Sequence, residues 1–286
     1  KFPIVVKADG LAAGKGVTIC KNRKQVINIS NQIFKGKFKS SKKIVLEEFL
    51  EGEEASYFLV VDKNNFKFFG SAQDHKRAYE KDLGPNTGGM GAYSPAPIID
   101  QKLEKKILKK IVKSSLKFLK KKGHPFKGFL YVGLMIKNGE PYLIEYNVRM
   151  GDPECQVIIP RLKTDLLKII INTINNKLKN TRILWREEKS MTIVLCSKGY
   201  PGNYKKNIII ENLEKIKLSK KQFIYHAGTR KNNFKILSAG GRVLNFTELG
   251  KNFFFIRKNI IRLIRKLNWK NGFFRKDIGW KIIPKR

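Results

Sequence analysis

The spacing of apolar residues predicts a small α+β unit over the first sixty-odd residues. Residues 25–34 carry apolar side chains on one side of a helix, and residues 10–16 form a loop with several glycines. Short apolar runs bounded by turn residues predict strands. Those runs are 3–9, 17–20, 43–50, 55–62 and 66–73.

A second set of elements follows a long loop at 74–97, which is rich in glycine and proline. Loops of that length are functional or disordered in most proteins. Residues 101–122 predict an amphipathic helix, with one apolar stripe and lysines elsewhere. Residues 128–136 and 141–149 predict two strands joined by an Asn138-Gly139 turn, a strong hairpin signal. Residues 165–178 predict a helix that Thr164 caps.

The pattern changes near residues 187–190, where short strands and one helix predict a further α/β domain. The predicted strands are 191–196, 208–210, 223–226 and 242–247, and the predicted helix is 253–267. We therefore expect three domains, at 1–66, 67–188 and 189–286.

Composition identifies a globular chain. Hydrophobic residues make up 42% of it, and no apolar run approaches the ~20 residues that a membrane-spanning helix needs. No signal-peptide pattern is visible, and residue 1 is not Met, so we expect that it is not the biological start. Cys20, Cys155 and Cys196 are widely spaced, which favours a reducing cytoplasm over a disulfide framework or a zinc site.

The charge balance raises one alternative function. Lys and Arg number 60 against 23 Asp and Glu, a formal net charge of +37. Such a balance is typical of nucleic-acid-binding proteins. The lysines, however, are spread along the whole chain without interleaved aromatic residues. We therefore favour a drift in composition and keep a basic nucleic-acid-binding module as the alternative.

Two stretches of the first unit suggest a nucleotide site. A lysine at a strand end, Lys7, and a second lysine, Lys15, bracket a loop in which Gly14 and Gly16 could fold backbone N–H groups over phosphates. An ordinary turn would show the same residues. Carboxylates gather at 47–54, where a solvated acidic turn and an adenosine-binding hinge are equally good explanations.

A third stretch places charged residues before a glycine-rich segment. Asp74-His75-Lys76-Arg77 precede residues 84–91, in which four glycines suit a backbone that closes on a ligand. His75 could be a catalytic base, but a lone histidine beside basic residues more often makes only a hydrogen bond.

The fourth stretch predicts a metal site. Strand side chains alternate in direction, so Glu145, Asn147 and Arg149 should share one face, while Ile144, Tyr146 and Val148 share the other. Carboxylate and amide oxygens suit Mg²⁺ held together with phosphates. Arg149 could stabilise charge on a transferring phosphoryl group. A plain amphipathic strand is the simpler alternative.

Taken together, these stretches resemble the ATP-grasp superfamily. Further motifs indicate one family within this superfamily. They are Asp74–Arg77, Gly84–Gly91, Gly151-Asp152-Pro153-Glu154, His226-Ala227-Gly228-Thr229 and residues 274–280. With these motifs the chain resembles the phosphoribosylamine–glycine ligase family, also called glycinamide ribonucleotide synthetases. The resemblance runs over nearly the whole chain. It implies an α+β fold, in which two α+β subdomains clasp ATP and a small C-terminal α/β domain follows.

The resemblance implies an enzyme that joins glycine to 5-phosphoribosylamine through a glycyl phosphate, at the expense of ATP, in purine biosynthesis. It implies Mg²⁺ or Mn²⁺, small-molecule partners only, a monomer and a cytoplasmic location. It assigns ATP contacts to Lys7, Gly14, Lys15, Gly16, Glu47, Glu48, Leu50 and Glu54, and the metal to Glu145 and Asn147. It assigns catalysis to Arg149, Asp152, Lys76 and Arg77, and substrate contacts to Asp74, His75, Asn86, Thr87, Gly88 and Gly89.

The chain departs from the family pattern in two respects. Residues 134–136, on the strand before Glu145, are apolar where many ATP-grasp enzymes have another metal carboxylate. The family also has an N-terminal nucleotide-fold domain, so we expect this chain to be a fragment with uncertain turnover. Another ATP-grasp carboxylate–amine ligase or carboxylase is the nearest alternative.

Overall fold

The computed structural model describes residues 1–10, 12, 16–38 and 41–284, which form two compact units. The first unit is Lys1–Gly52 and the second is Glu53–Arg286. The first unit holds a three-stranded antiparallel sheet in the order β2-β1-β3 and one helix. Its elements are β1 (Ile4–Ala8), β2 (Val17–Cys20), α1 (Arg23–Gln32) and β3 (Ile44–Glu48).

The first unit has a small core of its own. Val6 and Cys20 on the sheet pack against Ile29 and Ile33 on the helix side. Asn22 caps α1, because its side-chain oxygen accepts a hydrogen bond from the backbone N–H of Gln25 at 2.9 Å. These elements agree with the predicted strands and helix.

The second unit is built on one nine-stranded sheet. Its path is β10-β9-β4-β5-β8-β11-β15-β12, and β16 pairs with β11 at the side. The strands are β4 (Glu53–Asp62), β5 (Phe66–Asp74), β8 (Gly91–Ser94), β9 (Lys127–Lys137), β10 (Glu140–Asn147), β11 (Lys189–Ser197), β12 (Gln222–His226), β15 (Arg242–Gly250) and β16 (Gly272–Phe273). Two small hairpins accompany it, β6 (Arg77–Tyr79) with β7 (Leu83–Asn86), and β13 (Thr229–Asn232) with β14 (Lys235–Ser238).

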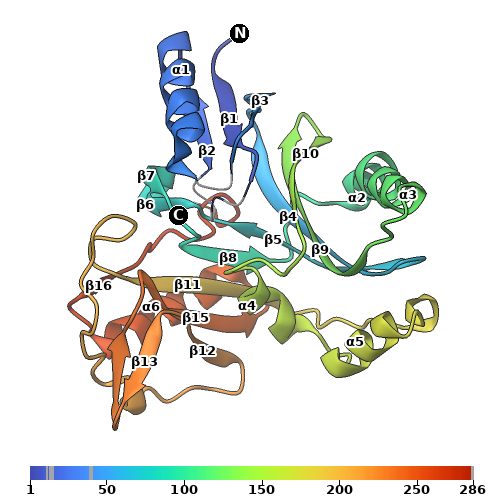
Figure 1. Ribbon diagram of the computed structural model, residues 1–286. Helices are drawn as coiled ribbons and strands as arrows, with labels where there is room; N and C mark the ends of the chain where they lie inside the picture. The colour runs from blue at the N-terminus through green and yellow to red at the C-terminus, as the bar shows by residue number, and fades with distance from the viewer. Residues whose placement is uncertain (11, 13–15, 39–40, 285–286) are drawn as a thin grey trace. The chain divides into compact units, whose positions relative to one another are not determined.

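Helices cover both faces of the strands β4 and β9 (Figure 1). Tyr57 and Leu59 face α2 (Gln101–Lys106) and α3 (Lys113–Lys121), which a wider turn at Ile107–Val112 joins into one helix. Phe58 and Val60 face the opposite core, with α4 (Cys155–Ile158) and α5 (Leu166–Ile174). The alternation along β4 therefore separates two apolar layers.

The C-terminal part has its own core but shares the sheet. The helix α6 (Phe253–Leu267) packs Ile256, Ile260 and Leu263 against β11 and β15. Its bounds are those predicted from the apolar period. Because β8 pairs with both β5 and β11, the predicted third domain continues the sheet of the second. The predicted boundary at 66 falls after β4, a strand of this large sheet.

Several local predictions were wrong. The segment 74–97 contains β6, β7 and β8 instead of being a loop throughout. The helix predicted at 165–178 ends at Ile174, and Asp165, not Thr164, caps it by accepting from the N–H of Lys168 at 2.8 Å. The strand predicted at 208–210 is only an isolated bridge from Ile209 to Leu237.

Candidate functional site

In the first unit, two of the predicted ATP-binding residues form an ion pair. Lys7 and Glu47 lie on the neighbouring strands β1 and β3, and Lys7 Nζ is 2.5 Å from Glu47 Oε2. Gly16 closes the glycine loop, since its carbonyl accepts from the N–H of Ala8 at 2.9 Å. Gly14 and Lys15 lie outside the described residues. Glu48 ends β3 and is exposed, and Leu50 follows it half-buried.

In the second unit, charged side chains converge over the strands β10, β9, β4 and β5. Lys76, just after β5, forms an ion pair with Glu54 on β4. A small pocket of about 10 Å³ lies between these side chains. Its lining includes Glu54, Ser56, Asp74, Lys76, Tyr131, Gly133 and Glu145. Glu154, the residue before α4, completes the group, and its Oε1 accepts from Ser56 Oγ at 3.1 Å.

Burial shapes the charges of this group. Burial raises the pKa of Asp74 to about 6, although Lys76 opposes the shift. Burial also raises the pKa of Glu154 to about 7, helped by the charge of Asp74. For Lys76, burial alone would lower the pKa, but Asp74 and Glu54 outweigh it and hold the pKa above its usual value. Lys76 is therefore positively charged, and it lies near two carboxyl groups, Asp74 and Glu154, whose raised pKa favours their protonated forms.

The two predicted metal ligands are adjacent. Glu145 and Asn147 lie two residues apart on β10, and Asn147 Nδ2 is 3.1 Å from Glu145 Oε1. Gly133 lies opposite Glu145 on β9, and a Cβ there would lie 3.1 Å from Glu145 Cγ. A carboxylate and an amide at one strand end fit Mg²⁺, which takes few protein ligands together with phosphate oxygens. Within the described ranges no set of three or more His, Cys, Asp and Glu side chains is arranged for a metal ion.

The predicted strand face was wrong beyond Asn147. The strand β10 ends at Asn147, so Arg149 lies outside it and donates through Nη1 to the carbonyl of Met150 at 2.9 Å. Val148 is 73% exposed instead of sharing an apolar face. On the opposite face Tyr146 does point toward the helices, where its hydroxyl contacts Ser115 Oγ at 2.6 Å.

The glycine-rich segment 84–91 is hydrogen-bonded to the charged residues 74–77 before it. Both the N–H and the hydroxyl of Thr87 donate to the carbonyl of Lys76, at 2.7 and 2.8 Å. Arg77 pairs with Asn86 across the hairpin β6–β7 and donates through Nη1 to the carbonyl of Gly84 at 2.8 Å. Gly89 has a φ of +111°, and a Cβ there would lie 2.4 Å from Pro153 Cδ. The segment therefore lies directly against the loop that carries Asp152.

Sequence reasoning missed the residue that joins these loops. Arg242, the first residue of β15, donates to the carbonyl of Gly88 at 2.6 Å and to the carboxylate of Asp152 at 2.8 Å. The predicted substrate-side residues Gly88, Gly89 and Asp152 thus lie together. An arginine directly after Gly240-Gly241 at a strand start is a signal that could have indicated it.

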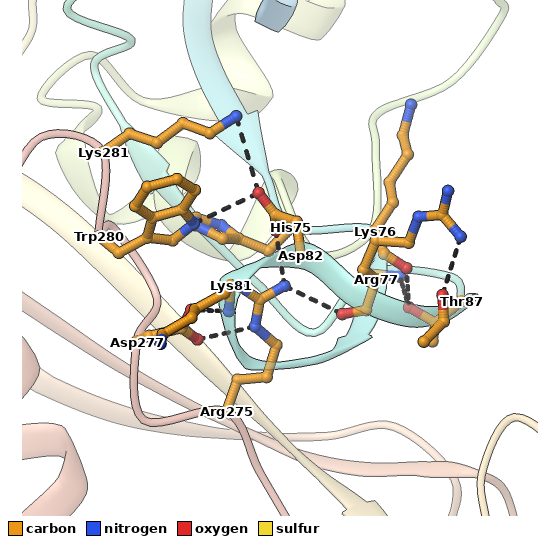
Figure 2. Close-up of polar contacts among 12 residues, drawn as sticks. His75, Lys76, Arg77, Lys81, Asp82, Thr87, Arg275, Asp277, Trp280 and Lys281 are labelled. Carbon is orange, nitrogen blue, oxygen red and sulfur yellow. Dashed lines mark hydrogen bonds and ion pairs between the residues drawn. The ribbon is translucent and has the colours of Figure 1, made fainter.

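The side chain of His75 contacts the C-terminal segment 275–281, which we call the C-terminal clamp (Figure 2). Its ring is 5% exposed, and its Nε2 accepts from the N–H of Gly279 at 3.1 Å, which places a proton on Nδ1. Burial, together with Arg275, lowers its pKa to about 4, so the ring is neutral. This is the hydrogen bond that we expected of a lone histidine, and substrate contact by His75 stays a prediction.

Arg275 is the centre of the clamp. Its guanidinium is 1% exposed and donates to Asp277 through Nε and Nη2 at 2.8 and 2.9 Å. Nη1 donates to Asp82 Oδ1 at 2.8 Å and to the carbonyl of Arg77 at 3.0 Å. Figure 2 shows these bonds reaching from the C-terminal segment to the hairpin β6–β7.

Across the described part of the chain, no helix is long and apolar enough to cross a membrane. Cys20, Cys155 and Cys196 are all free thiols.

Comparison with known proteins matches both parts of the chain to one family. Residues 1–155 match the model of the phosphoribosylglycinamide synthetase ATP-grasp (A) domain, and residues 190–281 match its C domain. The chain is 45% identical to a phosphoribosylamine–glycine ligase of Agrobacterium fabrum over 99% of its own length and 67% of the relative. For the chloroplastic ligase of Arabidopsis thaliana the values are 44%, 99% and 54%, so the chain spans between about half and two thirds of these relatives.

Solved structures agree with this match. A phosphoribosylamine–glycine ligase from Thermotoga maritima superposes with a TM-score of 0.86 at 34% identity, over 96% of this chain and 68% of that one. A biotin carboxylase from Campylobacter jejuni, at 13% identity and a TM-score of 0.68 over 93% of this chain and 57% of that one, shares the fold alone. The predicted ATP-grasp fold is therefore confirmed.

Proposed function

Because this chain belongs to the phosphoribosylglycinamide synthetase family, we propose that it carries the ligase chemistry for which its relatives are named. In that reaction ATP phosphorylates the carboxylate of glycine to give glycyl phosphate and ADP. The amine of 5-phosphoribosylamine then attacks the acyl carbon and releases phosphate, which leaves glycinamide ribonucleotide. One observation supports this best: Thr87 joins the glycine-rich segment to the cationic Lys76, and Arg242 joins Gly88 of the same segment to Asp152.

The residues of this chain act in the proposal by binding and positioning. The residues proposed to contact ATP are Lys7, Gly16, Glu47, Glu48 and Leu50 in the first unit and, taken by itself, Glu54 in the second unit. Phosphoryl transfer needs charge neutralisation and alignment more than a protein nucleophile. Lys76 and Arg77 offer positive charge for the acyl phosphate, as does Arg149.

Glu145 and Asn147 would hold the metal. Mg²⁺ or Mn²⁺ bound there supplies charge neutralisation on the phosphate oxygens of ATP. The two side chains lie together at a strand end, and the glycine at position 133 leaves room for the side chain of Glu145. We keep two protein ligands, because the strand before them offers only apolar residues at 134–136.

Asp74, Asn86, Thr87, Gly88 and Gly89 form the substrate side in this proposal. Asp152, half exposed, is an acceptor suited to an amine. We further propose a monomer that acts in a reducing compartment such as the cytoplasm, since all three thiols are free.

The deciding experiment measures ADP release while each substrate is omitted in turn. We would assay the chain as it is, and the chain preceded by the N-terminal domain that the family resemblance implies. The proposal expects ADP release that requires both glycine and 5-phosphoribosylamine. ADP release that ignores glycine but responds to another carboxylate or to bicarbonate would instead identify a different ATP-grasp ligase or a carboxylase.

A further inference from the structure

Arg242 lies where two loops of the proposed substrate side meet. Nη1 donates to the carbonyl of Gly88 at 2.6 Å and to the carbonyl of Asp152 at 2.7 Å, while Nη2 donates to Asp152 Oδ2 at 2.8 Å. The arginine side chain is 21% exposed and the aspartate side chain 50%. One guanidinium therefore holds a peptide of one loop and both a peptide and a carboxylate of the other.

The peptide groups flanking Gly88 are held from a second direction as well. The N–H of Gly88 donates to the hydroxyl of Tyr200 at 2.9 Å. A Cβ on Gly88 would lie 2.9 Å from Arg242 Cζ, and a Cβ on Gly241 would lie 2.1 Å from the ring of Tyr200. Both anchors come from the region that matches the C domain, whereas the loops they hold belong to the region that matches the ATP-grasp domain.

The Asp152 carboxylate has a fixed direction. Its Oδ2 accepts from Arg242, and its Oδ1 accepts from Gln156 Nε2 at 2.8 Å. The planar fork of an arginine can serve an aspartate oxygen and two carbonyls at once, but the single ammonium of a lysine cannot reproduce that geometry. The position of this carboxylate thus depends on Arg242 in particular.

We propose that Arg242 is a positioning residue for the ligase reaction, which fixes the Gly88 peptide and the Asp152 carboxylate in one arrangement on the substrate side. The inference rests on the function proposed above. In this proposal the C-terminal region contributes to the reaction, because its Arg242 fixes the positions of Gly88 and Asp152, which belong to the ATP-grasp region. Loss of alignment by about 1 Å can slow an enzyme on the order of 100-fold.

The test compares Arg242→Met and Arg242→Lys with the control Arg230→Met. Arg230 is an exposed arginine on β13, so its replacement removes a charge without touching the loops. For Arg242→Met we expect kcat/KM for glycine to fall about 100-fold, while KM for ATP stays within about twofold of wild type. The kcat/KM of Arg242→Lys should lie between those of wild type and Arg242→Met. Added guanidinium ion should restore part of the activity of an Arg242→Ala variant.

A second readout does not depend on turnover. Hydrogen exchange of the backbone amides in residues 84–91 should speed up in Arg242→Met and Arg242→Lys and should be unchanged in Arg230→Met. If wild type shows no glycine-dependent ADP release even when the N-terminal domain precedes it, the proposed function fails, and this exchange rate alone decides whether Arg242 holds the loop.

Two results would overturn the inference. One is an Arg242→Lys protein with wild-type exchange in residues 84–91 and wild-type kcat/KM. The other is a loss that raises KM for ATP as much as KM for glycine and follows the melting temperature, since that would be a general loss of structure.

Discussion

Glu154 is a carboxyl group that the fold encloses almost completely. It is 4% exposed, its Oε1 accepts from Ser56, and burial raises its pKa to about 7. The folded protein therefore binds a proton at this site up to a higher pH than the unfolded chain does. The stability that this proton contributes is complete below about pH 4.5 and is lost as the pH rises to about 7.

Replacement of Glu154 by Gln should flatten the pH dependence of stability. Between about pH 4.5 and 7, wild type should lose free energy of unfolding faster than Glu154→Gln, by up to about 1.4 kcal/mol per pH unit. Urea unfolding at several pH values would measure this. Glu140→Gln is the control, because Lys106 and Lys110 lower the pKa of Glu140 to about 2, which places its titration below this window. Parallel curves for wild type and Glu154→Gln would contradict the expectation.

The paired oxygens of Glu145 and Asn147 give a prediction about metal-dependent ATP use. The double change Glu145→Ala, Asn147→Ala should reduce Mg-dependent ADP release at least 100-fold, since a loss of both ligands removes the charge that aligns the phosphates. Binding of Mn²⁺, followed by electron paramagnetic resonance, should weaken in parallel. ADP release retained by the double variant would refute the assignment. Glu53→Ala, an exposed carboxylate at the start of β4, is a suitable control.

For single residues, the sequence predicted contacts between side chains that are close together in the chain. The adjacency of Glu145 and Asn147 follows from strand alternation alone. Arg149 differed because β10 ends two residues before it. The contact of Arg242 with Asp152 spans 90 residues, and no periodicity in a single sequence carries such a pairing.

Among the elements, the hairpin β6–β7 depends on the C-terminal clamp. Arg275 joins Asp82 and the carbonyl of Arg77 to Asp277, and its side chain is 1% exposed. Arg275→Met should therefore lower the free energy of unfolding by about 3 kcal/mol, the lower end for a broken buried pair, because Asp82 keeps some contact with water. Urea denaturation would measure the loss.

The neighbouring Lys276 provides the matched control. Its side chain is exposed, so Lys276→Met should change the free energy of unfolding by less than about 0.5 kcal/mol. Limited proteolysis should cut Arg275→Met within residues 76–86 before it cuts elsewhere. Equal stability in the two variants would mean that the clamp does not hold the hairpin.

Long periodic elements were predictable, and short ones were not. The helix α6 has the predicted bounds, since its apolar period is clear over four turns. The turn at Asn138-Gly139 was also predictable, because both residues take positive φ, 52° and 70°. The four-residue β8 was missed, because one of its two partners, β11, lies about a hundred residues further along and its own pattern is dominated by small residues.

For the whole molecule, the excess of positive charge should lower the free energy of unfolding. With a formal net charge of +37, like charges lie closer together in the folded state than in the unfolded chain. Raising NaCl from about 20 to 200 mM shortens the screening length to below about 10 Å, so the urea midpoint should rise. An unchanged or falling midpoint would show that the lysines are spaced widely enough to be harmless. The same titration with a short DNA duplex would show any salt-sensitive binding that the alternative function requires.

The strand β8 has a consequence for any attempt to divide this protein. It pairs with β5 through Gln73 and Asp74, and with β11 through Ser190 to Ile193. A version that stopped before residue 189 would present the unpaired backbone of β8 as an open edge, and such edges recruit strands from other molecules. We expect that shortened protein to precipitate or to form intermolecular sheets, although the family models describe its two parts separately.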